Sequence, residues 1–541
     1  MKKFNKIYSL IAFSVALSMT GCIDETMPES SSATADQVSE SAAALEGALN
    51  GIPSQMAQGY YVYGDQVHET DMAYPLFMIA QTEMLGDMYP CGSNSGYDWY
   101  RTYNTMSAAC GDNSYFSYLP WYTLYRFVKA ANDVIGSVDM EDETVSDEVK
   151  GMAGAAYAMR AFDYYLLTVF FEPVENKYTD VSKVKGLTVP IVTEATSPED
   201  AKANPRVTHE KMIEFILSDL DKAEKALKNW TPSTKNLPNL ATTYGIRAKV
   251  HLWDEDYENA AKYALMAIEE SGASPVTATQ WEDPTTGFAQ ANQAWMWYIG
   301  YDPENMGNLC NFVGWMSGEA DWGYSSLTFP SIDRSLYDKI GETDFRKTTF
   351  LHPNKFAYYD YKTVRDRDYI EDAPAYLALK FRCLQGDWET YSVGGAIDVP
   401  VMRVEEMYLI AAEAIGVSQS LSEGVNFLNT FMRNYRDPNY SCKATTAREF
   451  QLEVLTQMRI EFWGEGNAFP SAKRLRAGVM QNYSGTNAPA DIFKINCEGI
   501  KPIWNLVIPI SETNNNNALK DMNNPDPTLS VRGPSPEGEY Q

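Results

Sequence analysis

Residues 240–271 read LATTYGIRAKVHLWDEDYENAAKYALMAIEES, and this stretch decides the fold. It divides into two helical segments, 240–253 and 256–271, which are joined by a short acidic turn. Small residues recur at helical spacing in both segments: Ala248 in the first, and Ala260, Ala264 and Ala267 in the second. Because alanine leaves room for a close contact between helices, the stretch predicts a tightly packed helical hairpin.

A second pair of helical segments follows at 403–415 and 422–435. Both pairs resemble tetratricopeptide units, which are helical hairpins of about 34 residues. Small-residue helix pairs also occur in unrelated bundles, so this pattern alone leaves the exact repeat type open. The pattern predicts a mostly α fold with a tetratricopeptide-like scaffold of helical hairpins.

The rest of the chain divides into a helical part and an irregular part. Helical periodicity predicts helices over 43–58, 72–84, 119–138 and 147–171, and a further helix that begins at Thr208. Residues 272–399 instead alternate short aromatic stretches with Gly, Asn, Asp, Ser and Pro, which is typical of loops and short strands. We therefore expect one domain over 46–541, with a helical scaffold at 46–271 and 400–480 and a loop-rich ligand region at 272–399.

The N-terminus has the organisation of a lipoprotein signal peptide. Three lysines precede an apolar run over residues 7–17, and Gly21 stands directly before Cys22. A run this short cannot cross a hydrocarbon layer of roughly 30 Å as a stable helix, which favours a signal that is removed. We predict a signal peptide at 1–21, lipidation of Cys22 and a flexible, acidic, Ser-rich tether at 22–45. The alternative is an ordinary secretory signal with a chance cysteine.

The charge and the metal-binding residue types exclude several classes of function. The chain has 72 acidic and 44 basic residues, a net charge of −28, which argues against binding to nucleic acid or to anionic lipid. Six cysteines follow Cys22 without a C-x-x-C pair, and only four histidines occur, so we expect no zinc site, no cofactor and no catalytic centre. A disulfide between Cys91 and Cys110 and six free thiols are both compatible with the spacing, and acidic loops could hold a calcium ion.

Six motifs in one order resemble the SusD-like (RagB/SusD) family of nutrient-binding outer-membrane lipoproteins. They are Leu124–Val138 (LYRFVKAANDVIGSV), Ala155–Phe171 (AAYAMRAFDYYLLTVFF), Arg206–Thr208 with Ile216–Leu227, Val399–Glu413 (VPVMRVEEMYLIAAE), Arg459–Gly478 (RIEFWGEGNAFPSAKRLRAG) and Ile508–Asn516. The chain departs from the family pattern at Pro470-Ser471-Ala472, where an aromatic-Asp-Leu run is more usual.

The resemblance implies a lipid-anchored protein of the outer membrane that faces the cell exterior. It also implies a ligand surface on aromatic loops and a partner, a TonB-dependent (SusC-like) outer-membrane transporter. The motif residues themselves are expected to be structural. Arg459, Glu461, Lys473 and Arg474 should tie the C-terminal helices to the repeats through ion pairs.

Two loop regions correspond to the ligand surface of the family. The first, at 92–103, and the second, at 311–324, contain aromatic residues among Gly, Ser, Asn and Asp without helical spacing. Aromatic rings suit the C–H face of a sugar, and neighbouring polar side chains suit its hydroxyls. The candidate contacts are Tyr97, Trp99, Asn94, Asp98 and Arg101 in the first region and Trp315, Trp322 and Tyr324 in the second. Trp99 and Trp322 form the best candidate pair, whereas Trp121, Trp253 and Trp463 have core spacing.

The aromatic content, 13% of the chain with 35 tyrosines, agrees with a sugar ligand. We therefore predict a cell-surface glycan-binding lipoprotein, without enzymatic activity, that delivers oligosaccharide or polysaccharide to the transporter. One alternative is a protein of the same fold that captures peptides or another nutrient. The other is a glycoside hydrolase, which would need two carboxylates roughly 5–10 Å apart.

Overall fold

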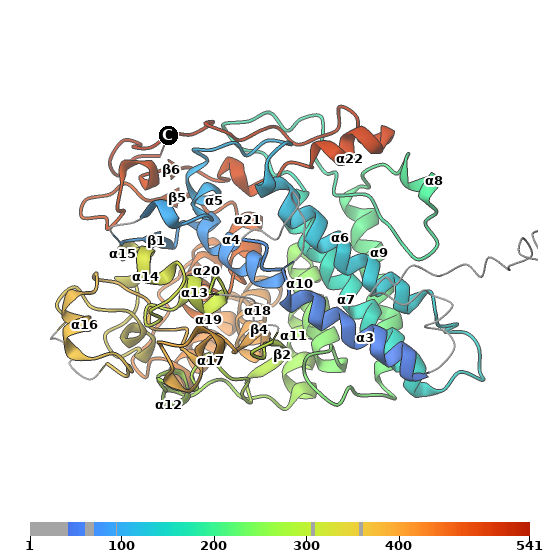
Figure 1. Cartoon of the computed structure of the whole chain (residues 1–541), viewed down its shortest axis with the longest axis horizontal. Helices are drawn as coiled ribbons and strands as arrows, with labels where there is room; N and C mark the ends of the chain where they lie inside the picture. The colour runs from blue at the N-terminus through green and yellow to red at the C-terminus, as the bar shows by residue number, and fades with distance from the viewer. Residues whose placement is uncertain (1–41, 60–69, 93–94, 305–308, 356–360, 541) are drawn as a thin grey trace, which may run out of the picture.

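In the computed structural model the chain is mostly helical, and the structure describes residues 42–59, 70–92, 95–304, 309–355 and 361–540 (Figure 1). The predicted fold class is confirmed: long helices form the scaffold, and short strands occur in pairs. The helices of the N-terminal half are α3 (Ala42–Ala57), α4 (Tyr74–Leu85), α5 (Arg101–Thr105), α6 (Tyr115–Ile135), α7 (Asp147–Phe171), α8 (Pro198–Ala201), α9 (His209–Leu227), α10 (Leu240–Trp253) and α11 (Tyr257–Ser271). Thr208 caps α9 by accepting a hydrogen bond from the Lys211 N–H, as the sequence predicts.

The two predicted hairpins are present and pack against each other. The first is α10 with α11, and the second is α18 (Val404–Ser418) with α19 (Leu421–Tyr435); α11 lies against α18. The alanines of the first hairpin, Ala248, Ala260, Ala264 and Ala267, are all fully buried. Their small side chains allow the close approach that the sequence predicted.

The described parts of 272–399, which are 272–304, 309–355 and 361–399, form a loop-rich insertion at one end of the molecule (Figure 1). Its short helices are α12 (Ala278–Trp281), α13 (Phe312–Met316), α14 (Ser325–Thr328), α15 (Arg334–Tyr337), α16 (Arg367–Asp372) and α17 (Tyr391–Gly394). Two antiparallel strand pairs attach the insertion to the scaffold. They are β1 (Met88–Pro90) with β3 (Pro330–Ile332), and β2 (Trp295–Gly300) with β4 (Asp398–Arg403).

The C-terminal part crosses back over the scaffold. It contains α20 (Ala447–Glu461), α21 (Phe469–Arg474), the strand pair β5 (Val479–Met480) and β6 (Asn496–Cys497), and α22 (Ile510–Asn515). One expected ion pair is present, because Arg474 pairs with Glu413 of α18 at 2.7 Å, whereas Arg459 pairs with Asp87, which lies between α4 and β1 and outside the hairpins. The expectation for Lys473 is wrong. Its ammonium donates to the carbonyl oxygens of Val169, Glu172 and Trp504, so it ties three backbone segments together without a carboxylate.

The polar residues of the helical motifs also stabilise the fold. Arg160 of α7 is 1% exposed and bonds Asp219 of α9 at 2.7 Å and Asn132 of α6 at 2.7 Å. Arg206 is buried too and donates to the carbonyl oxygens of Phe171 and Thr188. A buried arginine is tolerated only when its donors are satisfied, so these motifs specify how the helices join.

A neutral set of eight charged side chains lies buried where the second hairpin meets α20 and the insertion. Arg346, Arg403, Arg436 and Lys380 face Asp344, Glu405, Glu461 and Glu465, and each of the eight is at most 4% exposed. Glu461 lies at the centre, with its carboxylate 3.0 Å from Arg346, 3.1 Å from Arg403 and 2.7 Å from Arg436. The expected ion pairing of Glu461 is therefore confirmed, and it connects three segments that are distant in sequence.

His209 connects the ends of three helices and should make stability depend on pH. Its ring nitrogens lie 3.0 Å from Glu172, which follows α7, and 3.0 Å from Asp254, which follows α10. Burial lowers the pKa of His209, but the two carboxylates outweigh it and raise the pKa from 6.5 to about 10. A raised folded-state pKa adds stability that is complete below pH 6.5 and is lost as the pH rises through about 10.

We therefore expect His209→Gln to lower the free energy of unfolding by about 1–2 kcal/mol at pH 6, after allowing for solvent screening of the partly exposed Asp254. The difference from the parent should shrink above pH 7 and vanish above pH 10. Urea unfolding at pH 6, 8 and 10 measures it. Asp254→Asn should give a smaller loss in the same direction, and a difference that does not change with pH would contradict the assignment.

The remaining predictions for the chain ends and cysteines have different outcomes. The signal peptide, Cys22 and residues 22–41 of the tether lie outside the described residues, and α3 begins at Ala42. Among the described residues, the six cysteines after Cys22 form no disulfide, and Cys91 and Cys110 are not joined, which agrees with the free-thiol alternative. Within the described ranges, helices that are both long and apolar enough to cross a bilayer do not occur.

Candidate functional site

The two aromatic loops that the sequence singled out meet in space. The ring of Tyr97 lies 5.9 Å from that of Tyr324, and the ring of Trp99 lies 6.4 Å from Tyr324 at 78°. Tyr97 is 46% exposed and Trp99 is 37% exposed, which places them among the most exposed large apolar side chains of the described structure. We call Tyr97, Trp99 and Tyr324 the aromatic surface.

Buried aromatic rings hold the aromatic surface from behind. Tyr324 is half-buried and stacks on the indole of Trp315 at 4.4 Å, and Trp315 in turn contacts Tyr100 edge to face at 5.0 Å. Stacked and edge-to-face ring pairs at such distances contribute about 0.5–1.5 kcal/mol each beyond the area they bury. The buried rings of Trp315 and Tyr100 therefore hold the more exposed rings of the aromatic surface in place.

The backbone also joins the two loops. The N–H of Gly92 donates to the carbonyl oxygen of Thr328 at the end of α14, at 2.6 Å. A Cβ atom on Gly92 would lie 2.2 Å from the carbonyl oxygen of Leu327, so only glycine fits at this crossing. The sequence therefore fixes the approach of the loops at Gly92 as well as through the rings.

Several of the predicted contact residues do not present their side chains at the aromatic surface. Trp315 is 4% exposed, Trp322 is 7% exposed and Asp98 is 6% exposed, whereas Arg101 is half-buried. Asn94 lies outside the described residues. The structure thus places Trp99 next to Tyr324, whereas the sequence predicts Trp322 as its partner.

Glycines explain the burial of Trp322. A Cβ atom added to Gly394 would lie 2.6 Å from the indole ring of Trp322, and one added to Gly314 would lie 3.4 Å from it. The indole therefore fits closely against two bare stretches of backbone, one in α17 and one in α13. The closer of the two contacts is with Gly394, which lies 72 positions after Trp322, so the local sequence around Trp322 does not indicate it.

Asp98 belongs to a buried carboxyl pair beneath the aromatic surface. Its Oδ1 accepts the N–H of Tyr100 at 3.0 Å, and its side chain faces Glu83 of α4, which is fully buried. Burial raises the pKa of the Glu83 carboxyl well above its ordinary value, and the neighbouring charge of Asp98 adds to the increase. Burial also raises the pKa of Asp98. Asp98 therefore positions the loop that carries Tyr97 and Trp99.

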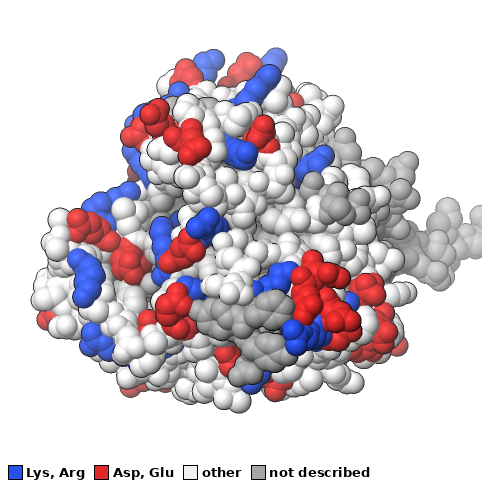
Figure 2. Space-filling model, turned by 90° about the vertical axis from the view of Figure 1, so that its left-hand side faces the viewer, with Lys and Arg blue, Asp and Glu red and all other residues white. Residues whose placement is uncertain are grey.

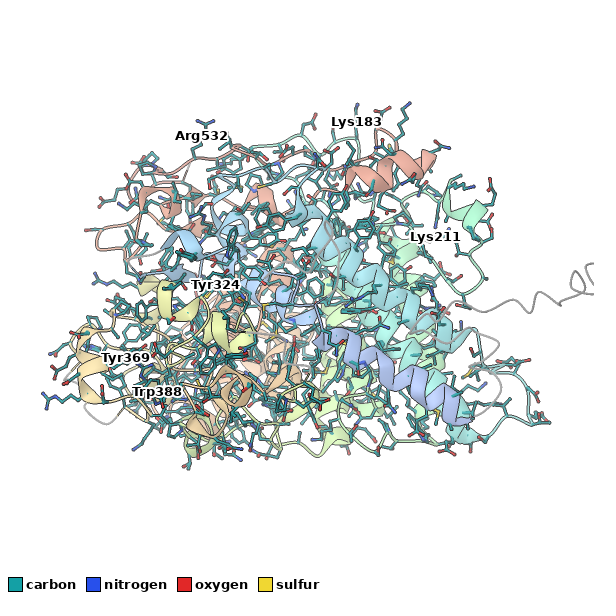
Figure 3. The ribbon with its side chains drawn as sticks, in the orientation of Figure 1. Lys183, Lys211, Tyr324, Tyr369, Trp388 and Arg532 are labelled. Carbon is teal, nitrogen blue, oxygen red and sulfur yellow. The ribbon has the colours of Figure 1, made fainter. Side chains whose placement is uncertain are left out.

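A second aromatic group, which the sequence analysis missed, lies on the same loop-rich insertion. The guanidinium of Arg365 lies 3.7 Å from the ring centre of Tyr369 and 4.0 Å from that of Trp388. Figure 3 shows Tyr369 and Trp388 below Tyr324 in this part of the molecule. The loop before Tyr324 connects the two groups, because the Asp321 N–H donates to the Trp388 carbonyl oxygen at 2.9 Å. The i, i+4 spacing of Arg365 and Tyr369 was the available signal, whereas Trp388 had none.

The surface of the loop-rich end carries interspersed charges of both signs, separated by broad uncharged areas (Figure 2). Such a surface suits a neutral ligand better than a polyanion or polycation. Among the described residues, no group of three or more His, Cys, Asp or Glu side chains is arranged to hold a metal ion.

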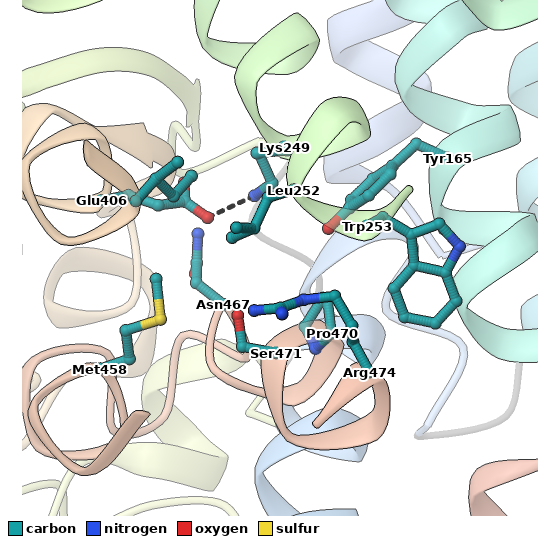
Figure 4. A pocket seen from close by; sticks show the side chains of 11 residues that line it. Tyr165, Lys249, Leu252, Trp253, Glu406, Met458, Asn467, Pro470, Ser471 and Arg474 are labelled. Carbon is teal, nitrogen blue, oxygen red and sulfur yellow. Dashed lines mark hydrogen bonds and ion pairs between the residues drawn. The ribbon is translucent and has the colours of Figure 1, made fainter. Parts of the chain in front are cut away.

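One cavity is lined by both acidic and basic side chains, but it is too small for a substrate. Lys249, Glu406 and Arg474 line it, and Lys249 donates to Glu406 at 2.6 Å (Figure 4). Its volume of about 10 Å³ matches roughly one water molecule. This cavity therefore does not favour the hydrolase alternative.

Comparison with known proteins identifies the family. Residues 63–252 match a SusD-like family model described as "Starch-binding associating with outer membrane", and residues 318–525 match the model of the SusD family. The chain belongs to the SusD-like family. The two matched segments include the helical scaffold except α3 and α11, the residues of the aromatic surface and the C-terminal motifs.

Known SusD-like proteins share sequence and fold with this member of the family. A SusD-like protein from Formosa agariphila is 29% identical over 207 residues, which are 36% of this chain and 37% of the relative. The chain thus aligns with little more than a third of that relative's length. A SusD-like carbohydrate binding protein from Bacteroides vulgatus has the same fold, with a TM-score of 0.70 and 19% identity over 88% of this chain and 97% of that one.

A further solved structure is the surface glycan-binding protein A from Bacteroides thetaiotaomicron in complex with laminarihexaose. It is 16% identical to this SusD-like chain, with a TM-score of 0.61, and the match covers 89% of this chain and 98% of that chain. At this identity the likeness establishes the fold.

Proposed function

We propose that this SusD-like protein binds neutral oligosaccharide or polysaccharide on the aromatic surface. The observation that carries the proposal is the meeting of Tyr97, Trp99 and Tyr324 from two separate loops, with two of the rings substantially exposed. Rings that are fixed before a ligand arrives lose little conformational entropy on binding. Two similar proteins of known structure carry glycan binding in their descriptions, which supports the same ligand class here.

The chemistry of the surface fits a sugar. An exposed ring offers a flat apolar face to the C–H side of a pyranose, and Arg101 offers up to five N–H donors to the hydroxyls. A Cβ atom on Gly96 would lie 3.9 Å from the Arg101 guanidinium, so this group reaches the same short loop as Tyr97. Trp315, Trp322 and Asp98 enter the proposal as supports of the surface. Asn94 remains a proposed contact.

The proposal also covers the cellular location of the protein. A lipid on Cys22 and the tether at 22–45 would hold the single domain, 46–541, on the outer membrane with its ligand surface toward the cell exterior. The partner would be a TonB-dependent outer-membrane transporter that receives the glycan. A tether of this kind keeps ligand and transporter at high effective concentration, so weak binding suffices. The matched family description, which names association with the outer membrane, supports this location.

Affinity electrophoresis against a panel of neutral polysaccharides, followed by calorimetry with the best ligand, tests the binding site. We expect Trp99→Ala and Tyr324→Ala each to weaken binding at least tenfold, which is about 1.4 kcal/mol. Tyr540→Ala is the matched control, because Tyr540 is as exposed as Tyr97, at 46%, but lies near the C-terminus.

Two results would overturn the proposal. One is a parent protein that retards on none of the polysaccharides, and the other is a pair of variants that bind like the parent. Thermal melting of each variant separates lost binding from lost folding. Incubation with the bound glycan should release no reducing ends, and their release would revive the hydrolase alternative.

A further inference from the structure

The second hairpin carries an aromatic hollow that the proposed glycan site does not use. Its volume is 530 Å³, and it lies along the outer face of α18 and α19. Four aromatic residues form its floor: Tyr408 from α18 and Phe427, Phe431 and Tyr435 from α19. We call it the α18–α19 hollow.

The aromatic rings of this hollow form one connected group. Tyr408 stacks on Phe431 at 5.1 Å and lies 6.1 Å from Phe427, and Phe431 lies 5.8 Å from Tyr435. Phe431 is buried, whereas the other three rings are half-buried and so reach the surface. The spacing of 427, 431 and 435 places the α19 rings in one row along the helix.

The polar residues around the rings are almost all uncharged. Glu423 is the single charged residue among the ten that line the hollow. By contrast, six of the ten residues that line the hollow between α7 and α9 are charged, and four of the seven that line the hollow at the start of α9 are acidic. In a chain with a net charge of −28, a large hollow lined by one charged residue differs clearly from the other hollows. It matches a neutral ligand.

Amide and hydroxyl groups stand at the rim of the hollow. Gln419, Asn426 and Asn434 are exposed, and in the described structure their side-chain amides bond to no other residue. Each amide offers both a donor and an acceptor, which is the pairing that a sugar hydroxyl requires. Half-buried rings beneath uncommitted amides are the same combination of chemistry that the aromatic surface offers to a pyranose.

From this combination we infer that the α18–α19 hollow is a second binding site for neutral oligosaccharide, separate from the aromatic surface. The inference takes its ligand class from the proposed function, but its residues come from other elements. Rings would contact the C–H face of the sugar, and Asn426 and Asn434 would bond its hydroxyls. Two sites on one chain would let a long polysaccharide bind more tightly than a short oligosaccharide, because the second contact is intramolecular.

Calorimetry with neutral hexasaccharides of glucose, mannose and xylose tests the second site on the full mature chain. We expect the parent to bind two hexasaccharides, and Phe427→Ala and Asn434→Ala each to weaken one site at least fivefold. Trp99→Ala should affect the other site alone. Asn229→Ala is the control, because Asn229 is an exposed asparagine at the rim of the charged hollow between α7 and α9. Asn434→Ala changes only an exposed amide, so it keeps the test valid if Phe427→Ala lowers the melting temperature.

The outcomes separate this inference from the proposed function. Binding that falls with Phe427→Ala and Asn434→Ala supports the hollow, even if Trp99→Ala has no effect and the aromatic surface fails. One binding site that only Trp99→Ala weakens overturns the hollow and leaves the proposed function standing. Glycan binding that is unchanged in both hollow variants also overturns the second site. That result would be expected if the hollow binds a helix of another protein and not a glycan. A parent that binds none of the hexasaccharides overturns it as well.

Discussion

Replacing Glu461 with glutamine should lower the free energy of unfolding by about 3–5 kcal/mol at pH 7. Glu461 is fully buried and accepts from Arg346, Arg403 and Arg436 at once. The glutamine keeps the shape but removes one negative charge from a set that holds four of each sign. The uncompensated positive charge then lies in a region with little water to screen it, which is the physical reason for the large effect.

The same prediction has a pH dependence. Burial opposes ionisation of Glu461, but the three arginines outweigh it and hold the pKa of this carboxyl well below its ordinary value of 4.5. A lowered folded-state pKa adds stability that is present above pH 4.5 and is lost as the pH falls below it. The difference between the parent and Glu461→Gln should therefore shrink below pH 4.5.

Urea unfolding of the two proteins measures both effects. Glu199→Gln is the matched control, because Glu199 pairs with Lys202 at 2.8 Å while its side chain is 84% exposed. An exposed pair contributes about 0–1 kcal/mol, so the control should unfold almost like the parent. A loss below 1 kcal/mol for Glu461→Gln would contradict the central role assigned to this residue.

Replacing Gly424 with alanine should destabilise the second hairpin, whereas the same substitution at Gly47 should stabilise the protein. A Cβ atom on Gly424 would lie 2.4 Å from the Cα of Gly416 and 2.8 Å from the ring of Phe450. The nearest atom is backbone, which cannot move aside as a side chain can. We expect Gly424→Ala to lower the free energy of unfolding by about 1–3 kcal/mol, and Gly424→Val by more.

Gly47 is the matched comparison for Gly424. It lies in α3, is exposed, and an added Cβ atom would meet nothing within 4 Å. Alanine in an open helix position is more stable than glycine by about 0.5–1 kcal/mol. Thermal or urea unfolding of the two variants should thus give shifts of opposite sign. Shifts of the same sign would show that the crossing of α18 and α19 at Gly416 tolerates a side chain.

Local sequence predicted the scaffold well, because its signals are local. The segments predicted at 147–171 and 240–253 agree with α7 and α10, and Thr208 caps α9. Helical periodicity and capping depend on neighbours within four or five positions, so one stretch of sequence contains the whole signal. The burial of Trp121 in α6 and of Trp253 in α10 is predicted for the same reason, whereas Trp463, which is also buried, lies in the turn after α20.

The candidate site was predicted only in part. Aromatic composition identifies the two loops and predicts Trp322 as the partner of Trp99, whereas in the structure the ring next to Trp99 is that of Tyr324. Trp322 is buried because Gly394 has no side chain and leaves a space that the indole of Trp322 fills. The Arg365 group was missed because Trp388 joins it from a distant position.

By itself, then, the sequence determined the class of the fold, the two hairpins and the loops that carry exposed rings. These depend on periodicity, composition and small residues that recur at fixed spacing. Only the tertiary structure decided which rings face solvent, which carboxyl groups pair, and that α18 and α19 leave an aromatic hollow lined by a single charged residue. Those outcomes depend on contacts such as Glu83 with Asp98 and Glu461 with Arg346, which join side chains that only long-range packing brings together.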